Sequence, residues 1–274
     1  MSDPRFDRFI DYVLLTPEEL LLARKAAQNV AQVLREALQP EMDERADHLV
    51  IGSIGKRTAI RPLGSVDLVY LLRDPRLLAE GLEPIERILR KGLPGIAPRP
   101  VAYGLEVPLE DFTVVTFLAR ERPGGFAFWT EQGFVDSHPA AEITALRLSD
   151  GLTSGRTTRL LILLKAWASA EAVPLPSFAL EILAREFMSD HGGEEWPDIL
   201  SDFFAWVRQS DTAALQRPGA GAPLPLPDPS WRRHAEAAYW RCVLAKRLAR
   251  EGDALAELQE WQRLLGPAFG HEEV

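Results

Sequence analysis

The sequence has a single cysteine, Cys242, and only five histidines. One cysteine cannot close an internal disulfide, and so sparse a use of cysteine is typical of a reducing compartment. The histidines are scattered along the chain without the short spacing that zinc ligands share. The sequence also lacks the G-x-S-x-G turn of a serine hydrolase. Thiol, zinc and serine-hydrolase chemistry therefore find no support.

Long apolar runs and an excess of positive charge are missing as well. The richest apolar run, residues 160–170, is interrupted by Lys165 and is too short to span a bilayer. The first residues carry charges rather than the apolar core of a signal peptide. With 40 acidic and 31 basic residues the net charge is −9, which repels the phosphates of nucleic acids. We expect a cytoplasmic protein with no membrane and no nucleic-acid partner.

The first half of the chain shows one long helix and then strand patterns. Thr16-Pro17-Glu18-Glu19 has the residues of a helix start with a capping box, and apolar residues at helical spacing continue to Leu38. Short strand-like runs follow, bounded by turn residues, with one helix among them. The strands are expected at residues 49–52, 66–72, 101–105 and 112–118, and the helix at 75–91.

The second half has helical periodicity almost throughout. Helices are expected at residues 140–148, 156–170, 178–188, 196–208, 231–251 and 254–265, with a proline-rich connector at 217–229. The pattern predicts an α+β protein. Residues 1–139 form an α/β lobe with an N-terminal spine helix, and residues 140–274 form a helical lobe.

The residues with the clearest chemistry follow the first predicted strand. Glycine at position 52 lets backbone N–H groups approach a phosphate, and the hydroxyl of Ser53 adds a donor. Lys56, Arg57 and Arg61 bring three positive charges to the same stretch. A Gly-Ser pair by itself is also common in plain turns between strands. The charged neighbours favour a phosphate site over a plain turn.

The whole stretch resembles a known signature. Gly52-Ser53, the spacer at residues 56–62 and the strand Ser65-Val66-Asp67 are similar to the Gly-Ser and Asp-x-Asp pattern of polymerase β-like nucleotidyltransferases. The spacer resembles that of the bacterial relatives of cyclic GMP–AMP synthase and oligoadenylate synthase. Four later segments resemble the same branch; they are residues 124–126 with 136–139, residues 163–167, residues 175–181 and residues 261–269.

The resemblance implies a fold, a ligand and an activity. That branch makes cyclic or linear oligonucleotide signals from nucleoside triphosphates in antiphage defence. Its pattern implies that Lys165 and Ser177 contact the triphosphate and that Phe178 stacks on the base. If so, Ser53 converges with Lys165 and Ser177 on one pocket. Without the resemblance, Lys165 would be interpreted as a solvated lysine on a helix and Phe178 as an aromatic residue of the core.

The sequence departs from the family where the metal ions are held. The family uses three carboxylates for two Mg²⁺ ions, one that activates the attacking hydroxyl and one that neutralises the triphosphate. Here the first strand carries Ser65 and Asp67, so one carboxylate of its pair survives. The strand of the third carboxylate aligns with residues 112–116, which places Thr113 where the family has aspartate. Neutral hydroxyls bind Mg²⁺ weakly.

Asp111 is the substitute carboxylate that the sequence offers. It lies two residues before Thr113, so a strand through both would present their side chains on one face. An acidic residue at the start of a strand is also commonly just solvated. Even with Asp111 in the site, Ser65 leaves the metal cluster one carboxylate short.

Three functional readings remain open. The first is a pseudo-nucleotidyltransferase, a nucleotide-binding sensor, scaffold or regulatory partner that works with another protein. The second is an active enzyme with a reduced metal site. The third is a protein that binds nucleic-acid ends, which the net charge disfavours. In each nucleotide-binding case we expect Mg²⁺ or Mn²⁺ to bind only together with the nucleotide, at Asp67.

Overall fold

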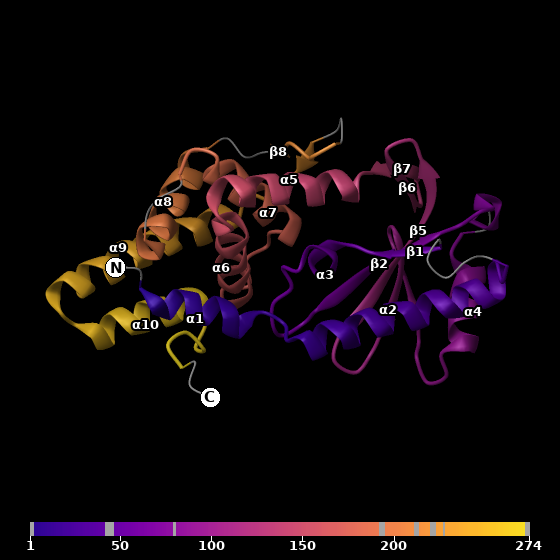
Figure 1. Cartoon of the computed structure of the whole chain (residues 1–274), viewed down its shortest axis with the longest axis horizontal. Helices are drawn as coiled ribbons and strands as arrows, with labels where there is room; N and C mark the ends of the chain where they lie inside the picture. Colours follow the sequence, from indigo (N-terminus) through magenta and orange to yellow (C-terminus); the bar gives the residue numbers. More distant parts are fainter. Residues whose placement is uncertain are drawn as a thin grey trace. The chain divides into compact units, whose positions relative to one another are not determined.

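The computed structural model describes residues 3–41, 47–78, 81–191, 195–210, 214–219, 223–226 and 228–271. The chain divides into two compact units. The α/β unit is Leu15–Ala141, and the helical unit is Met1–Leu14 together with Glu142–Val274. The first 14 residues therefore belong with the helical unit, although the sequence analysis placed them with the α/β lobe. Figure 1 shows both units.

The α/β unit opens with the predicted long helix. Helix α2 spans Pro17–Leu38 and begins with the complete capping box. The hydroxyl of Thr16 accepts from the Glu19 amide at 3.2 Å, and the Glu19 carboxylate accepts from the Thr16 amide at 2.7 Å. Each of these bonds satisfies an amide that the helix leaves without an internal partner. The start of α2 is therefore fixed by local sequence alone.

A seven-stranded mixed sheet forms the body of this unit. Its strands are β1 (His48–Val50), β2 (Ser65–Leu71), β3 (Arg99–Val101), β4 (Gly104–Pro108), β5 (Thr113–Arg122), β6 (Gly125–Thr130) and β7 (Gly133–Ser137). They lie in the order β1-β2-β5-β4-β3, and β6 pairs with the second half of β5 and with β7. The β2–β5 pair is parallel and the other pairs are antiparallel.

The two faces of the sheet differ in character. Alternate side chains of β2 and β5, among them Leu68, Val114 and Leu118, pack with α2 and with α4 (Glu83–Gly92) into the main core. Figure 1 shows α2 running along the sheet towards α4. The opposite face is only half-buried at the start of both strands. That half-buried edge carries Ser65, Asp67 and Thr113.

Several predicted elements need correction. Residues 124–126 and 136–139, which resemble the family, lie at the start and end of a β6–β7 hairpin that the sequence did not predict. The single strand expected at 101–105 is interrupted by a turn, which separates β3 from β4. The helix expected at 75–91 consists of the 3₁₀ helix η1 (Pro75–Leu78) and α4, and Gly81, between them, has a positive φ of 80°. The first strand, expected at 49–52, ends at Val50, and a short helix, α3 (Gly52–Lys56), follows it.

The helical unit consists of α1 (Pro4–Val13) and six later helices. These are α5 (Pro139–Thr153, which starts in the α/β unit), α6 (Arg156–Ala170), α7 (Ser177–Met188), α8 (Trp196–Gln209), α9 (Trp231–Glu251) and α10 (Ala254–Leu265). Two short strands pair with each other; they are β8 (Ala214–Leu215), just before the proline-rich connector, and β9 (Leu224–Pro225), within it. Within the described ranges, no helix is both long and apolar enough to cross a membrane.

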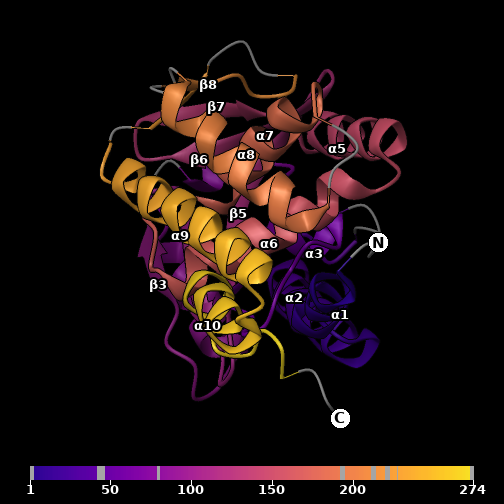
Figure 2. The ribbon, with the colours of Figure 1, turned by 90° about the vertical axis from the view of Figure 1, so that its left-hand side faces the viewer.

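Helix α6 is the centre of this unit. Its residues 160–164 are at most 1% exposed, as expected for a helix covered on all sides. The ring of Phe6 in α1 lies 5.1 Å from the Trp261 ring and 4.9 Å from the Phe269 ring, both with edge-to-face geometry. These contacts join the N-terminal helix to the end of the chain. Figure 2 shows α8 and α9 side by side, in agreement with their packing.

Candidate functional site

The parallel pair β2–β5 brings three predicted site residues together. Ser65 lies opposite Thr113 in the pairing register, and Asp67 lies two residues further along β2. Side chains alternate along a strand and align across paired strands, so all three share one face. The β2–β5 register therefore places Ser65, Asp67 and Thr113 on one face of two neighbouring strands.

Asp67 is held against the glycine of the Gly-Ser pair. A Cβ atom added to Gly52 would lie 1.9 Å from the Asp67 carboxylate oxygen Oδ2. The backbone joins the two residues as well, because the Ile51 amide donates to the Asp67 carbonyl at 2.9 Å. Gly52 has a φ of 59°, a left-handed value that side chains other than glycine's seldom allow. Glycine is therefore required here for both space and conformation.

The residues after Gly52 form a compact structure beside Asp67. Ser53 is half-buried in α3, and its carbonyl accepts from the Thr58 amide at 2.8 Å. Lys56 ends α3, and Arg57 follows with a left-handed φ of 59°. Residues 53–57, which follow the glycine against Asp67, thus contain one hydroxyl and two cationic side chains. Such a group of donors suits a phosphate.

The pairing register shows which residues could supply a further carboxylate from β5. Thr113 lies opposite Ser65 and Val115 lies opposite Asp67, so these are the two β5 positions beside the β2 pair. Both side chains are uncharged. Whichever of the two corresponds to the third aspartate of the family, β5 carries no carboxylate there.

The case for Asp111 as a substitute rested on a strand that the structure does not have. Strand β5 begins at Thr113, and Asp111 lies in the turn before it, where alternation does not apply. Asp111 lines a cavity of about 400 Å³ together with Glu19, Arg61 and Phe112. The Arg61 guanidinium is 3.9 Å from the Glu19 carboxylate. Because Asp111 precedes the strand, the alternation that would put it on the same face as Thr113 does not hold.

Glu106 is a further candidate for the site, and the sequence analysis did not find it. In the pairing register, Glu106 of β4 lies opposite Val115 of β5, and Val115 lies opposite Asp67 of β2. Glu106 and Asp67 therefore lie in one row across three neighbouring strands, with Val115 between them. Two strand spacings separate the Cα atoms of Glu106 and Asp67 by roughly 10 Å. Glu106 forms an ion pair of 3.2 Å with Arg99. The buried neighbours Leu105 and Val107 were the available signal, because alternation turns Glu106 to the other face.

The donors on this face do not match the two-metal arrangement of polymerase β-like enzymes. That arrangement needs three carboxylates around two cations, and β2 and β5 supply Asp67 alone at the matching positions. Among the described residues, no group of three or more His, Cys, Asp or Glu side chains could hold a metal ion. A cation at Asp67 would depend on oxygens from the triphosphate itself.

The other three predicted nucleotide contacts lie in the helical unit. Lys165 in α6 is only 7% exposed, which excludes the interpretation as a solvated helix lysine. Ser177 is exposed at the first position of α7, and Phe178 follows it half-buried. Helices α6 and α7 pack against each other, and Glu181 of α7 is buried too. Convergence of Lys165 and Ser177 with Ser53 stays a prediction.

Comparisons with known proteins agree at the level of the fold. No family model and no curated protein sequence matches the chain. Among solved structures, Vibrio cholerae DncV, a cyclic AMP–GMP synthase bound to the linear intermediate pppA(3′,5′)pG, aligns with a TM-score of 0.76 at 12% identity, over 99% of this chain and 98% of that one. Escherichia coli MS115-1 CdnC, in complex with HORMA-deltaN, aligns with a TM-score of 0.69 at 17% identity, over 98% of each chain.

The chain has the fold of these bacterial nucleotidyltransferases. The match covers both units, so the predicted α+β architecture with a polymerase β-like lobe and a helical lobe is confirmed. DncV is also known with GTP, at a TM-score of 0.73 and 12% identity over 99% of this chain and 97% of that one. Identities this low establish the fold alone. The chemistry of this chain has to be argued from its own residues.

Proposed function

We propose that this chain is a pseudo-nucleotidyltransferase, a nucleotide-binding sensor or regulatory partner that has kept the fold and lost the metal cluster. The observation that carries the proposal is the β2–β5 register. It places two hydroxyls, those of Ser65 and Thr113, opposite each other and leaves Asp67 as the single carboxylate of the expected three. Loss of two charged ligands weakens binding of the ion that activates the attacking hydroxyl.

Nucleotide binding does not depend on the lost carboxylates. Gly52 and Ser53 form the close turn beside Asp67, and Lys56 and Arg57 add positive charge. In this proposal Lys165 and Ser177 complete the triphosphate site, and Phe178 stacks on the base. Charge-assisted hydrogen bonds to phosphate are roughly twice as strong as neutral ones. A protein that still binds the nucleotide but hardly converts it to product can act as a sensor of that nucleotide.

Calorimetry with each ribonucleoside triphosphate and Mg²⁺ tests the binding site. Lys165→Gln and Ser53→Ala should each weaken affinity, the lysine change by about 10- to 100-fold if a charged hydrogen bond is lost. Lys91→Gln is the matched control, because Lys91 is an exposed helix lysine outside the site. A melting curve for Lys165→Gln shows whether the variant is still folded. Equal affinity in folded Lys165→Gln and the unmodified protein would contradict the site.

One observation favours a second candidate function, an active nucleotidyltransferase. Glu106 shares its row and face with Asp67 and lies one strand beyond the usual position of the third carboxylate. In that case the enzyme would make cyclic or linear oligonucleotides, and Glu106→Gln would abolish product formation. The pseudoenzyme proposal instead expects no product from either protein. Glu106 already pairs with Arg99, which competes with a metal for its carboxylate.

A sensor needs a second protein to act on. CdnC has been solved in complex with HORMA-deltaN, so a chain of this fold can bind a protein partner. We propose that this chain likewise passes its nucleotide-bound state to a protein partner. Analytical ultracentrifugation of the chain mixed with proteins encoded beside it, with and without nucleotide, tests this step. Complexes that form equally well in both conditions would contradict signalling by nucleotide.

A further inference from the structure

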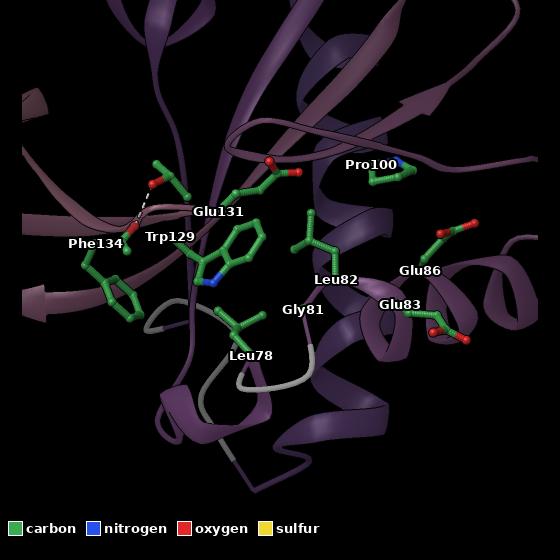
Figure 3. Close-up of a pocket in the computed structure, with 11 residues that line it drawn as sticks. Leu78, Gly81, Leu82, Glu83, Glu86, Pro100, Trp129, Glu131 and Phe134 are labelled. Atoms are coloured by element: carbon green, nitrogen blue, oxygen red, sulfur yellow. Dashed lines mark hydrogen bonds between the residues drawn. The ribbon is translucent and has the colours of Figure 1, made fainter.

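A cavity of about 580 Å³ lies on the α/β unit, away from the nucleotide site. Figure 3 shows it between the β6–β7 hairpin on one side and the start of α4 on the other. Trp129 stands in its centre, with Leu78 and Leu82 beside the ring. A volume of this size is typical of pockets that hold ligands.

The cavity and Asp67 are on opposite faces of the sheet. Trp129 and Phe134 pack on the main core, the same cluster that contains Leu78 and Leu82. That core lies behind β2 and β5, whereas Asp67, Ser65 and Thr113 point to the other face. A ligand in the cavity therefore cannot be the nucleotide that the first site holds.

The polar side chains around the cavity give it a negative charge. Glu83 and Glu86 of α4 lie on one side and Glu131 lies on the other, and the described lining residues include no Lys, Arg or His. Glu86 forms an ion pair with Arg90, and Glu83 lies 4.0 Å from Arg87. Glu131 forms no ion pair within the described residues. Its carboxylate is thus available to a cation from outside.

The apolar part of the lining suits a cation with an aliphatic stem. An ammonium or guanidinium group is attracted to the face of an indole ring, and its stem packs on leucine side chains. The same wall already holds one such contact, because the Arg120 guanidinium lies 4.1 Å from the centroid of the Phe134 ring. Trp129 offers the corresponding surface inside the cavity.

We propose that this pocket is a docking site for an arginine or lysine side chain of a partner protein. The cation would lie over Trp129 and pair with Glu131, and its stem would pack on Leu78 and Leu82. The overall charge of −9 would draw a basic partner to the chain.

Two strand edges border the pocket and favour a protein segment over a small free cation. Pro100 of β3 and Phe134 of β7 are among its lining residues. In the described part of the sheet, β3 pairs only with β4 and β7 only with β6. Backbone groups at such edges can bond to an extended peptide. The peptide would thus gain backbone contacts that a free amino acid lacks.

Fluorescence anisotropy with a defined probe tests the proposal on the full chain. The probe is a fluorescein-labelled pentapeptide with one central arginine between glycines and alanines, and its citrulline counterpart keeps the shape without the charge. The arginine peptide should bind more tightly than the citrulline peptide by about fivefold, and added salt should reduce the difference. Glu131→Gln and Trp129→Leu should each weaken the arginine peptide by about two- to fivefold.

Glu110→Gln is the matched control, since Glu110 is an exposed glutamate of the same unit outside the pocket. It should leave peptide affinity unchanged. Glu131 is exposed, so the Glu131→Gln variant should fold normally. If Trp129→Leu lowers the melting temperature, the affinity of the Glu131→Gln variant decides the test. Nucleotide affinity should stay unchanged in Glu131→Gln, which separates this test from the proposed function.

Three results would overturn the docking site. Equal binding of the arginine and citrulline peptides would remove the role of charge. Argininamide that binds as tightly as the peptide would make the pocket a small-cation site. A dimer in light scattering that dissociates in Glu131→Gln would show that the pocket binds a second copy of this chain.

Discussion

The carboxylate of Asp67 lies directly against the Cα atom of Gly52, in the place that any larger side chain would need for its Cβ. This contact joins the start of α3 to the carboxylate that we propose as the remaining metal ligand. The turn and the carboxylate therefore form one unit, which the nucleotide phosphates would contact together. A change at either residue should affect both folding and binding.

Gly52→Ala should damage the protein in two ways. The left-handed backbone costs alanine about 1–2 kcal/mol, and the clash with Asp67 adds to this. We expect a lower free energy of unfolding in urea and loss of nucleotide binding in calorimetry. Gly64→Ala is the control, because a Cβ at Gly64 meets no atom within 4 Å. Equal stability of the two variants would show that the turn is not constrained as described.

Restoring carboxylates should restore metal binding. Ser65 and Thr113 face each other across β2 and β5, so Ser65→Asp with Thr113→Asp places both new groups beside Asp67. We expect Mn²⁺ affinity, followed by electron paramagnetic resonance with nucleotide present, to rise more in the double variant than the single variants predict, because the groups share one site. If the double variant raises Mn²⁺ affinity only by the sum of the single variants, or not at all, the metal binds elsewhere.

Asp47 should be essential to the core beneath β2. Its side chain is 0% exposed, and it forms an ion pair with the largely buried Arg35 and a hydrogen bond of 2.7 Å with the Nδ1 atom of His48. Asp47→Ala would leave the Arg35 charge buried without this partner, so we expect a loss of about 3–5 kcal/mol in urea unfolding. Glu251→Ala, which removes the exposed partner of Arg247, should cause little change. Similar losses in the two variants would contradict this account.

Cys242 should be chemically silent in the native protein. It is completely buried in α9, and burial raises the pKa of its thiol far above the ordinary value. The thiolate is the reactive form, so a disulfide reagent should label Cys242 only after unfolding, even at alkaline pH. Mass spectrometry of the labelled chain with and without denaturant measures this. Fast labelling of the native protein would mean that α9 opens readily.

The sequence predicted the helices well where a cap or a buried stripe defines them. Helix α9 occupies the residues expected for it, and α2 begins at the capping box of Thr16 and Glu19. The β6–β7 hairpin was missed because its strands carry glycines and exposed residues, so no apolar alternation marks them. Helix α1 was also missed, although Asp3 and Pro4 supply a good N-terminal cap.

The candidate site was predictable in part. Gly52, Ser53 and Asp67 follow from a local pattern, and the shared face of Ser65 and Asp67 follows from strand alternation. Glu106 could not be found in this way, because it comes near Asp67 only through the register of two strand pairs. The same register, together with the start of β5 at Thr113, removes the strand argument for Asp111. Pairing register is set by the folded sheet and not by any one segment.

Product formation from the four ribonucleoside triphosphates with Mg²⁺ decides whether the chain is a pseudo-nucleotidyltransferase. Each missing carboxylate removes several kcal/mol of charge stabilisation at the transition state, and about 1.4 kcal/mol corresponds to a tenfold change in rate. The account therefore predicts no oligonucleotide in mass spectra after hours of incubation, although nucleotide binds. Robust product from the unmodified protein that disappears in Asp67→Ala would contradict it.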